Sequence, residues 1–110
     1  MGRCSEFVRR RFGFPVSAQE HVVAIGAGGL PLLVMNNNPD RVGWVVFNLG
    51  ASIAYMGLTS GVTALNGSQL AAGGGAATAS AMDEGEYTTF EQYSMGAGAT
   101  TLYILEFIGQ

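Results

Sequence analysis

The chain has 110 residues, 48% of them hydrophobic and only 12% charged, and its formal net charge is −3 with every basic residue an arginine. This length predicts one domain with a modest core, and the acidic balance argues against nucleic acid as a partner. The apolar runs fall far short of the roughly 18 residues of a membrane-spanning helix, so no membrane protein is expected. Charged residues are about half as frequent as the usual 25%, so some apolar surface is expected to face a partner.

The first part of the chain differs from the rest, and we interpret residues 1–19 as an N-terminal arm and residues 20–110 as a β-sandwich domain. The arm shows no helical or strand period. A frayed, solvated terminus is the alternative, but such a tail has no use for several phenylalanines. The arm residues expected to contact a partner are Arg9, Arg10, Arg11, Phe12 and Phe14.

The arm also bears on where the protein is made. It lacks the continuous apolar run of a secretory signal. The single cysteine, Cys4, cannot form an internal disulfide, which is typical of a reducing compartment. An intracellular origin is therefore expected, and Cys4 is interpreted as a plain thiol.

From Glu20 onward the pattern predicts short strands. Residues 21–25 and 30–35 are the first two, and the run from Asn36 to Asp40 predicts a loop. The stretch 41–58 is the densest in β-branched and aromatic residues, and we interpret it as a central hairpin with Trp44 in the core.

The second half continues in the same way. A short strand is expected at 62–65, and Asn66-Gly67 favours a type I′ turn. Residues 86–93 are predicted to form a strand rich in Thr and Tyr. The final strand, 100–108, is apolar on both faces, so one face is expected in the core and the other in an oligomer interface made by Tyr103, Leu105 and Phe107.

About eight short strands, turns rich in Gly, Asn and Asp, and no helical period predict an all-β fold, an antiparallel β-sandwich or jelly roll with an extended N-terminal arm.

Few residues offer chemistry. His21 is the only histidine, so a metal site of several histidines within one chain is excluded, and a strand or interface role is preferred to a catalytic one. The glycine runs at 26–29 and 73–75 are interpreted as turns, because neither precedes a predicted helix. We expect no catalytic residues, no cofactor and no metal.

An acidic patch lies around a predicted turn and is formed by Asp83, Glu84, Glu86 and Glu91. It lacks the pattern of a calcium-binding loop. A solvated face is the plainer interpretation, and the sharper one is a receptor for an arginine-bearing partner, including the arm of a neighbouring copy.

One family resemblance adds to this interpretation. Residues 34–108 resemble small β-sandwich virion proteins of tailed bacteriophages, of the head-decoration or cement type. The resemblance is carried by Asn38-Pro39-Asp40-Arg41, by the strand from Val45 to Gly50, by Ile53-Ala54-Tyr55-Met56-Gly57, by Gly61-Val62, by Leu70 to Gly74 and by a closing strand at 101–106.

The resemblance implies a structural, non-enzymatic protein made in the host cytoplasm and located on the capsid surface of the virion. It implies a homotrimer that binds the major capsid protein or other virion proteins and stabilises the shell by bridging subunits. Alternatives are a tail, collar or fibre-base protein of the virion, and a small carbohydrate-binding module that would use Tyr55, Tyr87 and Tyr93.

Overall fold

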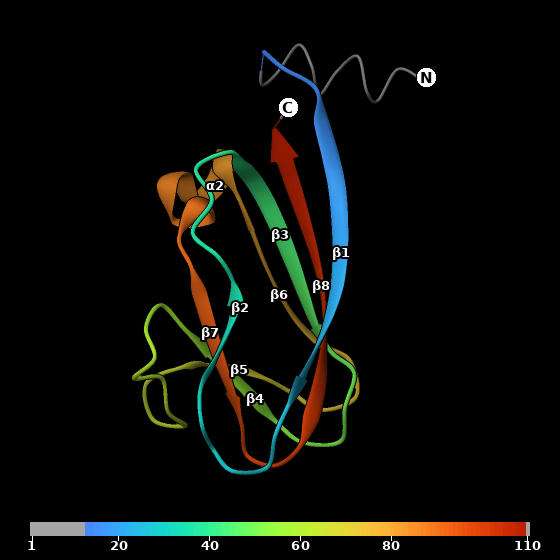
Figure 1. Cartoon of the computed structure of the whole chain (residues 1–110), viewed down its shortest axis with the longest axis vertical. Helices are drawn as coiled ribbons and strands as arrows, with labels where there is room; N and C mark the ends of the chain where they lie inside the picture. Colours follow the sequence, from blue (N-terminus) through green and yellow to red (C-terminus); the bar gives the residue numbers. More distant parts are fainter. Residues whose placement is uncertain (1–12, 110) are drawn as a thin grey trace.

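The computed structural model describes residues 13–109, apart from the side chains of Met82 and Asp83. These residues form two four-stranded antiparallel sheets packed face to face, as Figure 1 shows. The all-β sandwich expected from the sequence is therefore confirmed. No helix among the described residues is long and apolar enough to cross a bilayer.

The first sheet, which we call sheet A, has the strand order β1-β8-β3-β6, and the second, sheet B, has the order β2-β7-β4-β5. The strands of sheet A are β1 (Val16–Ile25), β8 (Thr100–Gly109), β3 (Arg41–Asn48) and β6 (Gly75–Ser80). Those of sheet B are β2 (Leu32–Met35), β7 (Gln92–Gly96), β4 (Ala54–Gly57) and β5 (Ser68–Leu70).

The core lies between the sheets and is set by alternation along the strands. In β8, Leu102 and Ile104 are fully buried, while the alternate residues Tyr103 and Leu105 are half-buried on the other face. Trp44 and Val46 of β3 point into the same core, so the sequence-based placement of Trp44 is confirmed. A strand side chain faces the side opposite to its neighbour's, and this period of two produces the two faces.

The central hairpin predicted for 41–58 is wrong. β3 belongs to sheet A and β4 to sheet B, so the chain crosses between sheets where a hairpin was expected. Asn48 explains the crossing: its side-chain amide donates to Ser52 O at 2.8 Å and Leu70 O at 3.0 Å, and its Oδ1 accepts from Thr100 Oγ1 at 2.6 Å. These bonds satisfy a fully buried polar side chain and hold the two sheets together at this corner.

The segment expected to be a strand at 86–93 is also different. A short helix, α2 (Ala81–Glu84), and a 3-10 helix, η1 (Gly85–Thr89), precede β7, which begins only at Gln92. The Glu84 carboxylate accepts a hydrogen bond from the backbone N–H of Ser80 at 3.0 Å, which links the last residue of β6 to the short helix that follows it. Local hydrogen bonding of this kind competes with strand pairing.

The region between β4 and β5 contains turns in place of the strand expected at 62–65. Asn66 Oδ1 accepts from Thr63 N at 2.6 Å, and its amide donates to Gly61 O at 3.2 Å. Neither Asn66 nor Gly67 has a positive φ, which a type I′ turn requires at both positions. The side chain of Asn66 organises the loop, and the type I′ turn is therefore wrong.

The start of the sandwich lies earlier than the boundary at residue 20. β1 begins at Val16 and pairs with β8 over its whole length, from Val16 opposite Gly109 to Ile25 opposite Thr100. Four residues assigned to the arm are thus part of sheet A.

Candidate functional site

The outer face of sheet A carries apolar side chains on each of its four strands. One row of side chains crosses all four strands. Tyr103 of β8 lies between Val22 of β1 and Phe47 of β3, and Phe47 in turn lies opposite Ala76 of β6. Phe47 and Tyr103 stack, with ring centroids 6.2 Å apart. In an ordinary antiparallel sandwich the outer face is polar, so this face departs from the usual pattern.

The next two rows continue the same surface. Leu105 lies opposite Val45, and Phe107 lies opposite Gly43, where a Cβ on the glycine would come within 3.4 Å of the Phe107 ring. We call this surface face A; its members on the two central strands are Tyr103, Leu105, Phe107, Val45 and Phe47. The structure therefore places on one face the three residues that the sequence assigned to an interface.

Face A carries one ionisable carboxylate, that of Glu20 in β1. Tyr103 donates its hydroxyl hydrogen to Glu20 Oε2 across the strand pair. This hydrogen bond, with smaller contributions from desolvation and from the charge of Glu20, raises the pKa of Tyr103 above its ordinary value of 10.0. The phenol therefore stays protonated to a higher pH than usual and holds Glu20 at the β1 edge of the apolar face.

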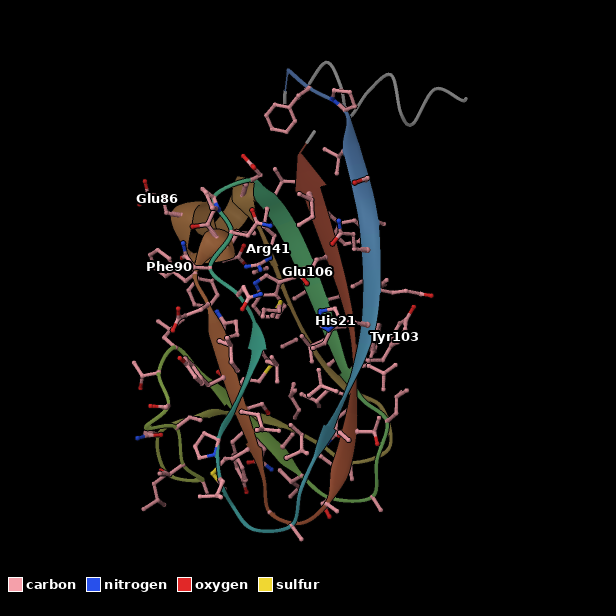
Figure 2. The ribbon with its side chains drawn as sticks, in the orientation of Figure 1. His21, Arg41, Glu86, Phe90, Tyr103 and Glu106 are labelled. Atoms are coloured by element: carbon pink, nitrogen blue, oxygen red, sulfur yellow. The ribbon has the colours of Figure 1, made fainter. Side chains whose placement is uncertain are left out.

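The inner face of sheet A holds an ion-pair network, shown in Figure 2, that joins three strands. Glu106 of β8 uses one carboxylate oxygen for Arg41 and the other for His21. Arg41 Nε lies 2.7 Å and Arg41 Nη2 lies 2.6 Å from Glu106 Oε1, while His21 Nε2 lies 2.8 Å from Glu106 Oε2. The three side chains come from β3, β8 and β1, so the network ties these strands together.

A β-bulge aims Arg41 into this network. Arg41 lies opposite Ile108 and Gly43 opposite Phe107, so Val42 is an extra residue in the register. The bulge turns the side chain of Arg41 inward, where its exposed fraction is only 1% against 13% for Glu106 and 38% for His21.

The remaining donors of Arg41 hold the loops at this end of the sandwich. Nη1 donates to Thr88 O and to Phe90 O, both at 3.3 Å, and Nη2 donates to Asn36 O. A planar guanidinium offers five donors in fixed directions, and here they join β8 to the loop after β2 and to the η1–β7 connection. Arg41 closes the Asn-Pro-Asp-Arg turn, in which Asn38 Oδ1 accepts from Asp40 N at 2.9 Å.

The network explains the position of His21. The structure confirms that His21 is a strand residue, and it adds a carboxylate partner that sequence reasoning missed. The signal was present in the sequence, because Glu106 is the one charge in an otherwise apolar strand and Arg41 is the one charge at the start of another. Among the side chains that the structure describes, no group of three or more His, Cys, Asp or Glu residues is arranged to hold a metal ion.

The other predicted site residues are placed as follows. Arg9, Arg10, Arg11 and Phe12 lie outside the described residues. Phe14 packs against the end of β8, where a Cβ on Gly109 would come within 2.5 Å of its ring. Of the acidic patch, Glu84 and Glu86 are exposed on α2 and η1 and Glu91 is half-buried before β7. The described carboxylates of this patch therefore lie on two short helices and on the connection to β7.

Aromatic residues proposed for a carbohydrate module do not form one platform. Tyr55 of β4 and Tyr93 of β7 lie on the outer face of sheet B, where Tyr55 is opposite Met95. Tyr87 lies in η1, with its ring centroid 6.3 Å from that of Trp44 and 6.3 Å from that of Phe90. The hydrogen bond to Glu91 raises the pKa of Tyr93, as Glu20 does for Tyr103.

The glycine runs are turns, as expected from the sequence. Residues 26–29 connect β1 to β2, and Gly73 and Gly74, which have φ values of +73° and +120°, lead into β6. Neither run precedes a helix, so neither has the geometry of a helix-linked phosphate loop.

Comparison with known proteins identifies the fold class. No family model matches the chain, and no curated protein matches it in sequence. A structure from Bacillus endospore appendages, described as a novel family of disulfide-linked pili, matches with a TM-score of 0.53 and 13% identity over 86% of this chain and 88% of that chain.

Two further solved structures match to a similar degree. A dTDP-4-dehydrorhamnose 3,5-epimerase from Bacillus anthracis matches with a TM-score of 0.53 and 13% identity over 94% of this chain and 60% of that chain. A cupin-2 domain protein from Shewanella frigidimarina matches with a TM-score of 0.50 and 12% identity over 80% of this chain and 68% of that chain. At such identities the likeness shows the fold alone: the chain is a jelly-roll β-sandwich.

Proposed function

We propose that this jelly roll is a structural subunit of a bacteriophage particle, a decoration or cement protein that binds the outer capsid surface and stabilises the shell by bridging subunits. The protein acts without catalysis, cofactor or metal, and it assembles as a homotrimer on the major capsid protein. The trimer and the location come from the resemblance to phage virion proteins.

The observation that carries the proposal is the composition of face A. Three of its rows across sheet A contain Tyr103, Leu105 and Phe107, with Glu20 as the one carboxylate. Contiguous apolar surface on a soluble domain marks an interaction site. Such a face is expected on a subunit that is permanently packed against other subunits, and it is not expected on a monomeric β-sandwich.

The likeness to the endospore appendage structure supports the same class of role. That protein belongs to pili by its description, and the match covers nearly all of its chain. A single jelly roll of this size therefore serves as a subunit of an extended assembly in at least one other system.

The mechanism is burial of apolar area at fixed positions. Each square ångström of apolar surface removed from water contributes about 25 cal/mol, and a subunit held between fixed neighbours makes each further contact at high effective concentration. Tyr103, Leu105 and Phe107 form the contact between copies, and the arm residues Arg9 to Phe12, with Phe14 at its base, add contacts to a partner.

The test begins with virions from a host that carries the gene. Heads and tails are separated, the copy number of the protein in each is measured by mass spectrometry, and purified protein is then added to heads that lack it. We expect saturable binding to heads and greater resistance of the shell to heat. Deleting residues 1–14 should lower the occupancy of heads sharply. Absence from heads, with no binding when protein is added, would overturn the proposal.

The alternatives give different results in the same experiments. Enrichment in the tail fraction favours a tail, collar or fibre-base protein. Binding of the isolated protein to a glycan array, lost on Tyr55→Ala and Tyr93→Ala, favours a carbohydrate-binding module, which the shared face of these two tyrosines on sheet B makes the second candidate.

A further inference from the structure

The charges of this protein are separated along the chain. Residues 1–12 contain four of the five arginines and one of the eight carboxylates, so this segment carries +3 and the remaining residues carry −6. The fifth arginine, Arg41, is buried against Glu106 and has no share in the surface. The described surface therefore presents carboxylates without a single arginine or lysine to pair with them.

Face A combines this lack of cations with exposed apolar area. Val22 is 63% exposed beside Tyr103, and the carboxylate of Glu20 is held there by the Tyr103 hydroxyl. A carboxylate fixed among aromatic and aliphatic side chains is best covered by a segment that offers both an arginine and apolar groups, because an unpaired charge on a buried surface is costly.

Residues 1–12 have this composition. Phe7, Val8 and Phe12 surround the three consecutive arginines at positions 9–11. Arginine also stacks on aromatic rings, and face A offers the rings of Phe47, Tyr103 and Phe107. Opposite net charge and matching apolar content make the segment complementary to the face.

The length and the attachment point of the segment fit as well. Twelve extended residues reach about 40 Å, and a ten-residue strand such as β8 is about 33 Å long, so the segment spans the whole of face A. It joins the sandwich at the end of sheet A, where Phe14 packs on Gly109.

The attachment point at the end of sheet A is compatible with a second copy of the chain as the receiver of the segment. Pro15 disfavours a helical backbone at Phe14, the residue before it, and Phe14 is held against the last residue of β8. A head-to-tail exchange in which each arm lies on the next copy closes into a ring when the rotation between copies permits, as a trimer requires.

We infer that residues 1–12 of one copy lie on face A of the adjacent copy, with arginines of the segment paired to Glu20. This inference deepens the proposed function, because it assigns the arm to a second copy of the chain. It concerns the purified protein alone, so it can fail while the protein still binds heads, and it can hold in a protein that belongs to another assembly.

Disulfide trapping tests the inference on the full chain, with the one native thiol, Cys4, as the reporter. A second thiol is introduced on face A by Val22→Cys or Ala18→Cys, both at exposed positions of β1. Two positions are used because the register of the arm along face A is not known in advance. The matched control is Gln69→Cys, an exposed position on the outer face of sheet B. Each protein is oxidised mildly and analysed by non-reducing gels and by mass spectrometry of the linked peptides.

We expect covalently linked chains in which Cys4 of one copy is bonded to the introduced thiol of another, with at least a tenfold higher yield for a face A position than for Gln69→Cys. Equal yields in all three proteins, or products linked only between two Cys4 thiols, would overturn the inference. A disulfide within one chain, seen as loss of both thiols at the monomer mass, would also overturn it, because the arm would then cover its own sheet.

A charge exchange separates pairing with Glu20 from simple proximity. Glu20→Arg in the Val22→Cys protein should lower the yield several-fold, and so should Arg9→Glu, Arg10→Glu and Arg11→Glu together. A mixture that pairs the reversed arm with the Glu20→Arg face should restore trapping between the two proteins. Failure of the mixture to exceed either protein alone would contradict pairing with Glu20.

Discussion

Arg41 is the residue on which the end of the sandwich depends. Its guanidinium is 1% exposed, shares the carboxylate of Glu106 with His21, and donates to backbone carbonyls of two loops. A buried ion pair adds little net stability over apolar residues of the same shape, but breaking it leaves a buried charge unpaired. Removing either Arg41 or Glu106 alone should therefore reduce stability more than replacing both with apolar residues.

Arg41→Met is expected to lower the free energy of unfolding by about 3 kcal/mol, because Glu106, which is only 13% exposed, keeps His21 as its one remaining partner. Urea denaturation followed by the fluorescence of Trp44, which lies opposite Glu106, measures the loss. The double variant Arg41→Met, Glu106→Leu should be more stable than the single one. A single variant within about 1 kcal/mol of the wild type would show that the network is dispensable.

Tyr103 should titrate above the ordinary tyrosine pKa of 10.0, because it donates to Glu20. A raised pKa in the folded state means that this contact stabilises the protein below pH 10 and that the stabilisation is lost as the pH rises through the folded-state pKa. Ultraviolet titration of the phenols checks this. Glu20→Ala should lower the pKa of Tyr103 and leave that of Tyr93, which depends on Glu91, unchanged. An unaltered titration curve would refute the assignment.

At the scale of the elements, strands with a clear local alternation were predictable, whereas the crossing between the sheets and the helical segment before β7 were not. Alternation in 100–108 is local, so the two faces of β8 were correctly read from the sequence. The crossing after β3 depends on Asn48 meeting Leu70 and Thr100, which are remote in sequence. Residues 81–89 contain Thr and Tyr, which favour strands, yet they fold as α2 and η1, where Tyr87 packs against Trp44. In both places, contacts between residues remote in sequence determine the local structure.

The candidate site divides in the same way. The face made by Tyr103, Leu105 and Phe107 follows from the alternation of side chains along one strand. The inward orientation of Arg41 depends on a β-bulge, which the residue types in this stretch do not predict. The charge separation between residues 1–12 and the sandwich is visible in the sequence, but its meaning depends on finding that Arg41 is buried.

Asn48→Ala is expected to destabilise the protein by about 2–4 kcal/mol, because it leaves Leu70 O and the hydroxyl of Thr100 without their partner in a buried corner. Chemical denaturation measures the change. The matched control is Asn66→Ala in an exposed loop, which should cost less than about 1 kcal/mol. Equal effects at the two positions would mean that the crossing between sheets is held by other contacts.

At the scale of the whole molecule, the jelly roll presents an apolar face, a carboxylate fixed within it, and an arginine-rich segment attached at its end. These features suit a protein that is completed by other copies of itself. The core that makes the sandwich stable is separate from face A, because alternate residues of the same strands serve the two purposes. Substitutions on face A should accordingly alter assembly without unfolding the domain.

The mass of the purified protein in solution, determined by light scattering, tests this central claim most directly. We expect a trimer for the wild type, a trimer for Leu65→Glu, whose side chain is 97% exposed outside face A, and a monomer for Leu105→Glu that still folds, as judged by its circular dichroism. The same oligomer for Leu105→Glu as for the wild type would contradict the claim that face A joins the copies, and a wild-type monomer would leave face A without a role in self-assembly.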